Sequence, residues 1–375
     1  MPADRRLKVL RLANFVSPTS GGIRTVMRRL SHAHADLGVH STIVVPGPSS
    51  GIEAVPGVLD VGTLPGMPLA PGQPYRLVLS RPAIRSLIDE VRPDVVEVHD
   101  QLTLAWVGGE CRGRGIRSVL VAHERLDLLA AFWSRLPVAA RPTLRWLARL
   151  GRSVDAVVAP SEFAATPYAD AGIDVSVIPW GVDHSIFHLR DVTTRSSEAR
   201  PTAGGDSEAK PTAGGIRLVH AGRLSAEKDP TLSARAAEYI AGTGVDVELI
   251  VIGSGPEAAQ VARHPHARMV GYVDGPHRMA ELLRSADVFV APGPFETFGV
   301  SALEAMACGL PVVCRESGSI SEIPQTRPAP GTAQGFGEAA LALRRDPRAR
   351  AGSAASAASY TWEEAARQLL AGYER

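Results

Sequence analysis

Short runs of Val, Ile, Leu and Ala alternate along the chain with longer segments in which apolar residues recur every three or four positions. Such runs, bounded by Gly, Pro or Ser, predict buried strands, and the longer periodicity predicts helices. The predicted strands are 8–13, 40–45, 94–98, 117–122, 155–159, 175–178, 216–222, 247–252, 286–291 and 311–314. Strands that alternate with helices favour an α/β fold.

A stretch of different composition separates the predicted strands into two groups. Residues 198–205 read E-A-R-P-T-A-G-G and recur at 208–215 as E-A-K-P-T-A-G-G. Pro, Gly, Thr and charged side chains cannot bury a core, so we expect a flexible insertion here. A second stretch rich in Pro and Gly, 46–74, is predicted to be a loop. The chain of 375 residues is long enough for two domains.

Composition excludes some classes of protein. The formal net charge of +1 gives no electrostatic argument for binding nucleic acid. Cys111, Cys308 and Cys314 form no C-x-x-C pair, which favours buried thiols in a reducing cytoplasm over a disulfide framework. No apolar run has the length of a membrane span or the core of a signal peptide.

The segment 294–311 carries two carboxylates between two predicted strands. Glu296 lies in the loop, and we expect Glu304 in the first turn of the helix that follows. Free amides at a helix N-terminus bind phosphate favourably, and carboxylates can accept hydrogen bonds from sugar hydroxyls. The segment is therefore consistent with a sugar-nucleotide site. Ser301 and Glu304 also fit a capping box, in which Glu304 only caps its own helix. The spacing leaves both interpretations open.

Two further turns follow predicted strands in this half. Arg223 and Lys228 could clamp a diphosphate, the arginine as a bidentate fork and the lysine as a point charge, or they could equally belong to an ordinary surface loop. Gly253 and Gly255 belong to a G-x-G-x-x-A pattern, which is the basis for an alternative function as an NAD(P)-dependent oxidoreductase. The first predicted strand is not followed by G-x-G-x-x-G, which counts against that alternative.

In the first half, candidate residues also follow predicted strands, where α/β proteins bind ligands. His123 could hydrogen-bond a sugar hydroxyl or organise a reacting centre, with a purely structural histidine as the alternative. Asp100 and Arg125 are weaker candidates, since Asp100 could simply orient a neighbour. Gly22 precedes a predicted helix and could let a phosphate approach the backbone.

An arginine-rich amphipathic segment covers 128–152 and is predicted to form one or two helices. It could lie on a membrane surface. It could equally pack on the sheet and direct its arginines to water.

Together these motifs resemble the retaining glycosyltransferases of family 4. P-F-E-T-F-G-x-x-x-L-E-A-M-A-C-G-L-P-V-V resembles the family's E-x7-E motif, and G-R-L-x-x-E-K-x-P its diphosphate-binding motif. F-x-x-P-x-x-G-G-I-x-T resembles its first loop. V-x-D-x-L-T followed by H-E-R-L-D resembles the phosphatidylinositol mannosyltransferase-like branch. The resemblance covers nearly the whole chain apart from the repeat.

The resemblance implies the GT-B fold, an α/β architecture of two Rossmann-like domains facing an interdomain cleft. The implied parts are an acceptor-side domain at 1–180, a linker with the repeat at 181–215, a donor-nucleotide domain at 216–358, and a helix at 359–375 that crosses back. Where the chain crosses between the domains, Trp180 replaces the commoner asparagine. We expect this departure to affect the hinge and not the chemistry.

Site roles also follow from the resemblance. Glu296 would position the hexose and Glu304 the ribose, while Arg223 and Lys228 would hold the diphosphate and stabilise the leaving group. His123 would line the reacting site. The implied donor-binding residues are Gly22, Gly253, Gly255, Val273, Phe298, Gly299, Val300 and Glu304, and those on the acceptor side are Asp100 and Arg125.

The expected activity is transfer of a hexose, mannose, from GDP-mannose to a lipid-linked or glycan acceptor, without a bound metal or other cofactor. The expected location is the cytoplasm or the inner face of the cell membrane, with peripheral membrane contact and no nucleic-acid partner. One alternative is transfer from a UDP-sugar to a soluble natural-product acceptor. Another is a non-catalytic sugar-nucleotide-binding protein.

Overall fold

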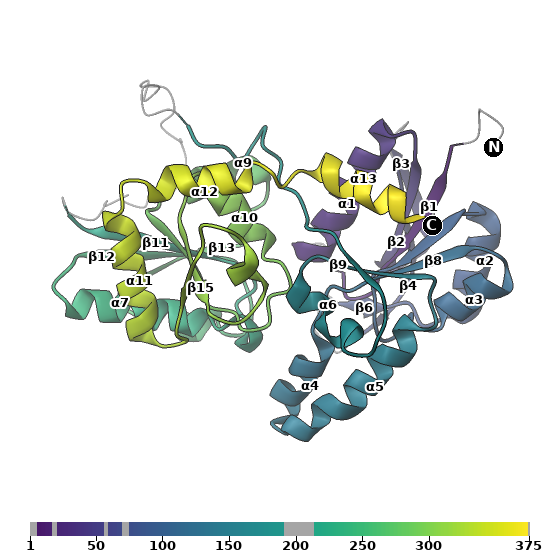
Figure 1. Ribbon diagram of the computed structural model, residues 1–375, viewed down its shortest axis with the longest axis horizontal. Coiled ribbons are helices and arrows are strands. Elements are labelled where there is room, and N and C mark those ends of the chain that lie inside the picture. Colours follow the sequence, from purple (N-terminus) through teal and green to yellow (C-terminus); the bar gives the residue numbers. More distant parts are fainter. Residues whose placement is uncertain (1–5, 17–20, 56–58, 70–74, 191–213, 374–375) are drawn as a thin grey trace. The chain divides into compact units, whose positions relative to one another are not determined.

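The computed structural model describes residues 6–16, 21–55, 59–69, 75–190 and 214–373, which form two compact units (Figure 1). Met1–Gly181 and Tyr360–Arg375 form the first unit, and Val182–Ser359 forms the second. The corresponding boundaries expected from the sequence are 180 and 359. Most of the tandem repeat, and with it the predicted flexible insertion, lies outside the described residues.

The first unit is built on an eight-stranded sheet. Its strands are β1 (Lys8–Leu12), β2 (His40–Gly47), β3 (Gly51–Val55), β4 (Leu59–Pro65), β7 (Val95–Val98), β8 (Arg117–Val121), β9 (Ala156–Ala159) and β10 (Val175–Val177). They run in the order β10-β9-β8-β7-β1-β2-β4-β3, and all neighbours are parallel except β3 and β4. A separate antiparallel pair joins β5 (Met67–Pro68) to β6 (Arg76–Leu77).

The prediction of a loop over 46–74 is therefore wrong, because this segment contains β3, β4 and β5. Its Gly and Pro residues mark the edge of the sheet, where β3 forms the last strand.

Helices cover both faces of the first sheet. They are α1 (Gly22–Asp36), α2 (Arg81–Val91), α3 (Val107–Gly113), α4 (Leu126–Ser134), α5 (Ala140–Gly151), α6 (Glu162–Ala169) and α13 (Trp362–Tyr373), with the 3₁₀ turn η1 (Pro137–Ala139). Leu10, Val96 and Leu120 share the main hydrophobic core with residues of α2, α3, α5 and α6. The alternate positions of β1 and β7, Arg11 and Glu97, consequently point to the other face, which α1 and α13 cover. Figure 1 shows α13, the last helix of the chain, lying on α1.

The second unit contains a six-stranded, entirely parallel sheet. Its strands are β11 (Ile216–Ala221), β12 (Val247–Ile252), β13 (Ala267–Gly271), β14 (Val288–Ala291), β15 (Val312–Arg315) and β16 (Arg327–Ala329), in the order β13-β12-β11-β14-β15-β16. Its helices are α7 (Pro230–Gly242), α8 (Ala258–Val261), α9 (Pro276–Arg284), α10 (Val300–Ala307), α11 (Ala333–Arg345) and α12 (Ala349–Ala357), with 3₁₀ turns η3 (Ala226–Lys228) and η4 (Ser319–Glu322). Every residue of β11 is buried, as expected for a central parallel strand.

Both sheets reverse their strand order once. In the first unit the reversal lies between β1 and β7, and in the second between β11 and β14. The loops that leave the carboxyl ends of two such strands diverge and open a crevice, which is where doubly wound sheets bind ligands. These two points therefore locate the candidate site residues within each unit.

The three cysteines are free and buried, as predicted. Burial raises the pKa of Cys111 to about 12 and those of Cys308 and Cys314 to about 11, so the thiols stay protonated at neutral pH. Among the described residues, no helix is both long and apolar enough to cross a membrane.

Candidate active site

Two predicted catalytic residues meet at the strand reversal of the second sheet. Lys228 ends η3, which follows β11, and Glu296 lies in the loop after β14. The Lys228 Nζ is 2.5 Å from the Glu296 Oε2, and the side chains are 31% and 26% exposed. Because β11 and β14 are neighbours, their loops bring a cation and a carboxylate together at a partly open position. This pair can offer one charge to a phosphate and the other to a sugar hydroxyl.

The loop after β14 ends at the N-terminus of α10. Gly299 is the N-cap with φ +83°, and a Cβ there would lie 2.6 Å from the Ile320 side chain, so only glycine fits. The Ser301 hydroxyl does not cap the helix but donates to the Ala221 carbonyl at 3.2 Å, which ties α10 to the end of β11. The capping-box alternative is therefore wrong.

Glu304 lies in the second turn of α10, not the first, because the helix begins at Val300. Its side chain and that of Val300 are half-buried, whereas Phe298 is buried.

The G-x-G turn after β12 packs tightly against the loop after β11. A Cβ on Gly253 would lie 1.9 Å from the Gly222 carbonyl oxygen, and one on Gly255 would lie 2.3 Å from that of Leu224. Three backbone hydrogen bonds between the two loops, 2.9 to 3.0 Å long, include Leu224 N to Ser254 O. The two glycines are thus required by close packing of backbone on backbone, and this packing holds the segment that carries Arg223.

Arg223 is exposed, with its Nη1 3.8 Å from the Glu227 Oε1. Val273 follows β13 and is half-buried. The structure gathers Arg223, Lys228, Glu296 and the two glycines of the turn around the carboxyl ends of β11, β12 and β14. Their contacts with a donor remain predictions.

In the first unit, His123 lies just beyond β8 and His99 just beyond β7. The His123 Nε2 is 2.7 Å from the His99 Nδ1, and the His99 Nε2 is 3.0 Å from the Glu97 Oε2. Glu97 is fully buried against Arg11, with Nε to Oε2 at 2.6 Å, and it also accepts a hydrogen bond from the Tyr373 hydroxyl. His123 therefore stands at the end of a buried polar chain that the sequence did not predict.

Burial and charge act in opposite directions on these groups. Burial would raise the pKa of Glu97, but Arg11 and His99 lower it well below its usual range overall. Burial lowers the pKa of His99, and burial together with the neighbouring His99 lowers that of His123 well below 6.5. Glu97 is consequently ionised at neutral pH, and both histidines are neutral.

Trp180 packs directly on His123. The ring centroids are 6.0 Å apart at an interplanar angle of 31°, and Trp180 is 2% exposed. Trp180 therefore contacts the candidate histidine, a neighbour that the sequence did not predict, and its expected effect on the hinge alone stays a prediction.

Two other candidates of the first unit, Asp100 and Arg125, have partners nearby. Asp100 accepts hydrogen bonds from the Leu102 and Thr103 amides, which orders its own loop. Arg125 makes a bidentate pair with Asp127 at 2.8 and 2.9 Å. Gly22 is exposed at the start of α1, and a Cβ placed there would meet no described atom within 4 Å apart from its chain neighbours and its own helix. The sheet reversal places Gly22 and His99 beyond neighbouring strands, β1 and β7.

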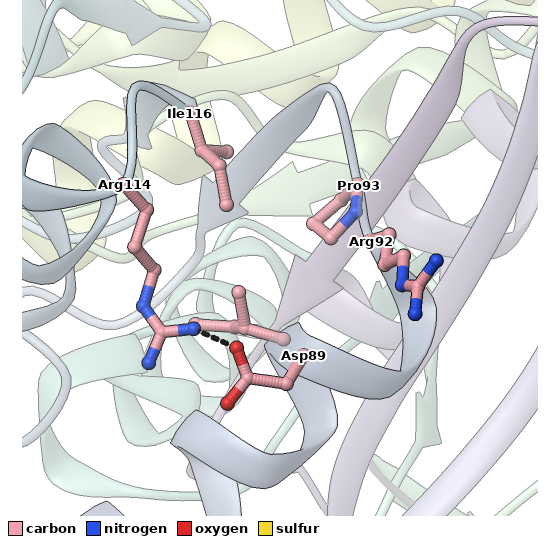
Figure 2. Close-up of a pocket in the computed structure, with 6 residues that line it drawn as sticks. Asp89, Arg92, Pro93, Arg114 and Ile116 are labelled. Atoms are coloured by element: carbon pink, nitrogen blue, oxygen red, sulfur yellow. Dashed lines mark hydrogen bonds and ion pairs between the residues drawn. The ribbon is translucent and has the colours of Figure 1, made fainter.

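A shallow pocket opens at the opposite, amino-terminal ends of β7 and β8 (Figure 2). It is lined by Ile88, Asp89, Arg92, Pro93, Arg114 and Ile116. Arg114 and Asp89 form an ion pair within it. None of the candidate site residues lines it, and it lies away from the strand ends that carry His99 and His123.

Comparisons with known proteins agree with the motifs. The family model described as Glycosyltransferase Family 4 matches residues 20–186, and that described as Glycosyl transferases group 1 matches residues 215–346. The chain is 34% identical over 380 residues to the GDP-mannose-dependent alpha-(1-6)-phosphatidylinositol dimannoside mannosyltransferase of Mycobacterium tuberculosis, covering 97% of this chain and 95% of that protein. It is 27% identical to a GDP-mannose-dependent alpha-mannosyltransferase of Corynebacterium glutamicum, covering 85% of this chain and 74% of that protein.

Solved structures share the fold. Sucrose-phosphate synthase from Thermosynechococcus elongatus superposes with a TM-score of 0.76 at 18% identity, covering 98% of both chains. The Anabaena protein HepE in complex with UDP and glucose superposes with a TM-score of 0.71 at 16% identity, covering 98% of this chain and all of that one. These likenesses confirm the predicted GT-B fold.

The near full-length similarity also resolves the choice between a transferase and an oxidoreductase, since the glycine turn that suggested the latter has its own explanation in backbone packing. The chain therefore belongs to glycosyltransferase family 4 and is a glycosyltransferase.

Proposed function

We propose that this protein is a retaining mannosyltransferase that uses GDP-mannose and acts on a lipid-linked acceptor. The ion pair between Lys228 and Glu296 at the strand reversal of the second sheet carries the proposal. The donor and the acceptor class are suggested by relatives whose names specify GDP-mannose and phosphatidylinositol dimannoside.

In the proposed reaction, Glu296 and Lys228 have different roles. Glu296 orients the transferred mannose through its hydroxyls, and Glu304 binds the ribose. Lys228 and Arg223 take up the negative charge that grows on the diphosphate as its bond to the sugar breaks. Charge stabilisation of this kind is commonly the largest single contribution to catalysis. His123 keeps the role that the family resemblance implies, which is to line the reacting site.

Lys228 already lies beside Glu296 at the carboxyl ends of β11 and β14, so a bound diphosphate would be a second anionic partner for this lysine. We propose that the two cations suffice and that no divalent metal is required. Transfer unaffected by EDTA would support this, whereas activity restored only by Mg²⁺ or Mn²⁺ would overturn it.

The test compares Lys228→Met with Arg268→Met. Lys228 and Arg268 each form an ion pair in the second unit, but the pair of Arg268 with Glu248, 2.6 Å long, lies outside the site. We expect Lys228→Met to lower the turnover of GDP-mannose by about 100-fold or more, the scale of losing one preorganised charge partner. Arg268→Met should retain wild-type turnover. Equal rates in all three proteins would refute the assignment.

A parallel donor screen by thermal shift uses GDP-mannose, UDP-glucose and UDP-N-acetylglucosamine. Stabilisation by GDP-mannose that Glu304→Ala abolishes is the expected result. Stabilisation by a UDP-sugar alone would overturn the choice of donor but leave a glycosyltransferase. Donor binding without transfer to any acceptor, lipid or soluble, would indicate a non-catalytic sugar-nucleotide-binding protein.

The acceptor class is supported by a surface at the tip of α4, η1 and α5, here called the arginine hairpin (residues 126–152). Trp133, Leu136 and Val138 are 61%, 57% and 58% exposed, a degree unusual for large apolar side chains gathered within six residues. Five arginines and no carboxylate lie between Asp127 and Asp155. Apolar side chains beside uncompensated positive charge fit the interface of an anionic membrane. We propose that the arginine hairpin binds such a membrane, from which a lipid acceptor is drawn.

Vesicle sedimentation tests this surface separately from catalysis. Wild-type protein should bind vesicles of phosphatidylglycerol more tightly than those of phosphatidylcholine, and Trp133→Ser/Leu136→Ser should lose most of that binding. Leu79→Ser is the matched control, since Leu79 is also an exposed apolar residue of the first unit, at 49%. Equal binding by all three proteins would overturn the proposal for the hairpin, whatever the donor.

A further inference from the structure

Glu97, His99 and His123 connect the centre of the first sheet to the carboxyl ends of its strands. Glu97 belongs to β7, His99 follows the same strand, and His123 follows the neighbouring β8. We propose that Glu97 and His99 are positioning residues that fix His123 as the neutral tautomer with its proton on Nε2. His123 then presents Nδ1 as a hydrogen-bond acceptor. The catalytic consequence rests on the proposed function, but the tautomer does not.

The proton positions follow from Glu97 outwards. A carboxylate can only accept, so the 3.0 Å contact between the Glu97 Oε2 and the His99 Nε2 places a proton on that nitrogen. A neutral His99 then carries a lone pair on Nδ1. The 2.7 Å contact from there to the His123 Nε2 requires that His123 donate, which places its single proton on Nε2. The Nδ1 of His123 is left as the basic nitrogen.

The ionised state of Glu97 starts this sequence, and Arg11 maintains it. Arg11 and Glu97 occupy the same register on β1 and β7, and both are 0% exposed. The remaining nitrogens of the guanidinium donate to Ser31 and Ser41 and, at 2.6 Å, to the Nδ1 of His34. One fixed cation and one fixed anion therefore balance each other beneath α1 and α13.

The other titratable groups that face this pair are uncharged. His34 accepts from Arg11 at Nδ1, so its proton lies on Nε2, which donates to the Ala366 carbonyl at 3.1 Å. Burial and Arg11 lower the pKa of His34 to about 4. The Tyr373 hydroxyl donates to Glu97, and burial and Glu97 raise the pKa of Tyr373 well above its ordinary value. Near neutral pH, His34 and Tyr373 are therefore neutral, whereas Glu97 remains ionised.

Trp180 completes the arrangement from the outside. Its indole packs over the imidazole of His123, which is only 9% exposed, and so shields the ring from water. A neutral, oriented imidazole can accept a hydrogen bond from a sugar hydroxyl, whereas an imidazolium could only donate. In the proposed reaction His123 therefore acts as an acceptor of fixed direction. The pH dependence of the transfer rate should therefore show no titration of His123 between pH 6 and 8.

The first test needs neither donor nor acceptor. Protein labelled with ¹⁵N-histidine is studied by long-range ¹H–¹⁵N NMR at pH 7, and His123 is assigned by its absence in His123→Gln. We expect a protonated Nε2 and an unprotonated Nδ1. A proton on Nδ1, or on both nitrogens, would overturn the proposal. The result stands even where GDP-mannose proves not to be the donor.

Two variants of His99 then separate positioning from packing. His99→Gln keeps an amide donor for Glu97 and a carbonyl acceptor for His123, so the tautomer and most of the turnover should persist. His99→Leu removes both hydrogen bonds and should lower turnover roughly 10- to 100-fold, the effect of losing an orienting hydrogen bond elsewhere. In His99→Leu, the pH dependence of turnover should also show the protonation of His123. Equal turnover and equal pH profiles in the two variants would contradict the proposal, and should His99→Leu not fold, His99→Gln and the NMR result decide.

Discussion

The buried pair of Arg11 and Glu97 permits a quantitative test of what stabilises the first unit. Glu97→Gln keeps the size of the side chain and a carbonyl for hydrogen bonding but removes the charge. Arg11 is then a fully buried guanidinium without its anion, since Nε and Oε2 are 2.6 Å apart and neither residue is exposed. Removing one partner of such a pair destabilises a protein by about 3–5 kcal/mol, because desolvation of the remaining charge is no longer offset.

The double variant Arg11→Met/Glu97→Gln removes both charges. Since no uncompensated charge remains, we expect it to be more stable than Glu97→Gln alone. The interaction free energy from the double-mutant cycle should be about 2 kcal/mol or more, within the range for groups in direct contact. It will not reach the wild type, because Ser31, Ser41 and His34 lose the guanidinium as their partner.

Urea unfolding followed by tryptophan fluorescence is the appropriate assay. All five tryptophans of the sequence, Trp106, Trp133, Trp146, Trp180 and Trp362, belong to the first unit, so the signal reports this unit selectively. For an m-value of about 3 kcal/mol/M, a loss of 3–5 kcal/mol lowers the midpoint by roughly 1–1.7 M urea.

The control for this experiment is Glu248→Gln, which breaks the 2.6 Å pair with Arg217 in the second unit and should leave the fluorescence transition in place. Strictly additive losses for Arg11→Met and Glu97→Gln would refute the reasoning, because they would show that the two charges do not stabilise each other.

Three further predictions concern other parts of the chain. Burial lowers the pKa values of His34 and His220 to about 4, so between pH 6.5 and 4 the unfolded chain binds more protons than the folded protein. As the pH falls through this range, each histidine should lower the stability of its own unit by about 1.4 kcal/mol per pH unit. A urea midpoint unchanged between pH 7 and 5 would contradict this. Gly253→Ala should destabilise the second unit by about 1–3 kcal/mol or more, because the new Cβ meets the Gly222 carbonyl at 1.9 Å. The variant should therefore have a lower melting temperature and weaker donor binding. Gly242→Ala should be tolerated, because a Cβ at this helical site would meet no described atom within 4 Å apart from its chain neighbours and its own helix. Equal melting temperatures for Gly253→Ala and Gly242→Ala would contradict the packing argument. Deleting residues 197–214 should leave turnover and the melting temperature nearly unchanged, since loop length contributes little to stability; loss of soluble protein would show a structural role.

The elements most accurately predicted from the sequence are those with a strong apolar pattern. The predicted bounds of β12, Val247–Ile252, agree with the structure, and β11 differs by a single residue. By contrast, β3 and β4 lie in a segment whose Gly and Pro residues indicate a loop. Such strands become stable only through pairing at the edge of a sheet, and pairing partners cannot be found from local pattern alone.

The same limit explains what was missed in the site. Arg11 and Glu97 each interrupt an apolar run, which is a signal in itself, but only the register of β1 on β7 shows that the two charges compensate each other. Trp180 was expected to affect the hinge because its sequence neighbours lie at the domain crossing, and its contact with His123 depends on the course of β9 and β10 between them. Lys228 and Glu296 were each predicted through family motifs. Their ion pair depends on the adjacency of β11 and β14.

The division of the chain has a consequence for how the protein is made on the ribosome. The first unit takes its closing helix, α13, from the C-terminus, and the whole of Val182–Ser359 is synthesised before that helix exists. At 5–20 residues per second, translation of the second unit takes about 10 to 40 s. During this interval Glu97 lacks the Tyr373 hydroxyl, and α1 lacks the contacts that α13 makes with it. A nascent chain interrupted just before its last helix would therefore carry a finished second unit and an unfinished first one, which makes the first unit the part that a chaperone or a protease would meet.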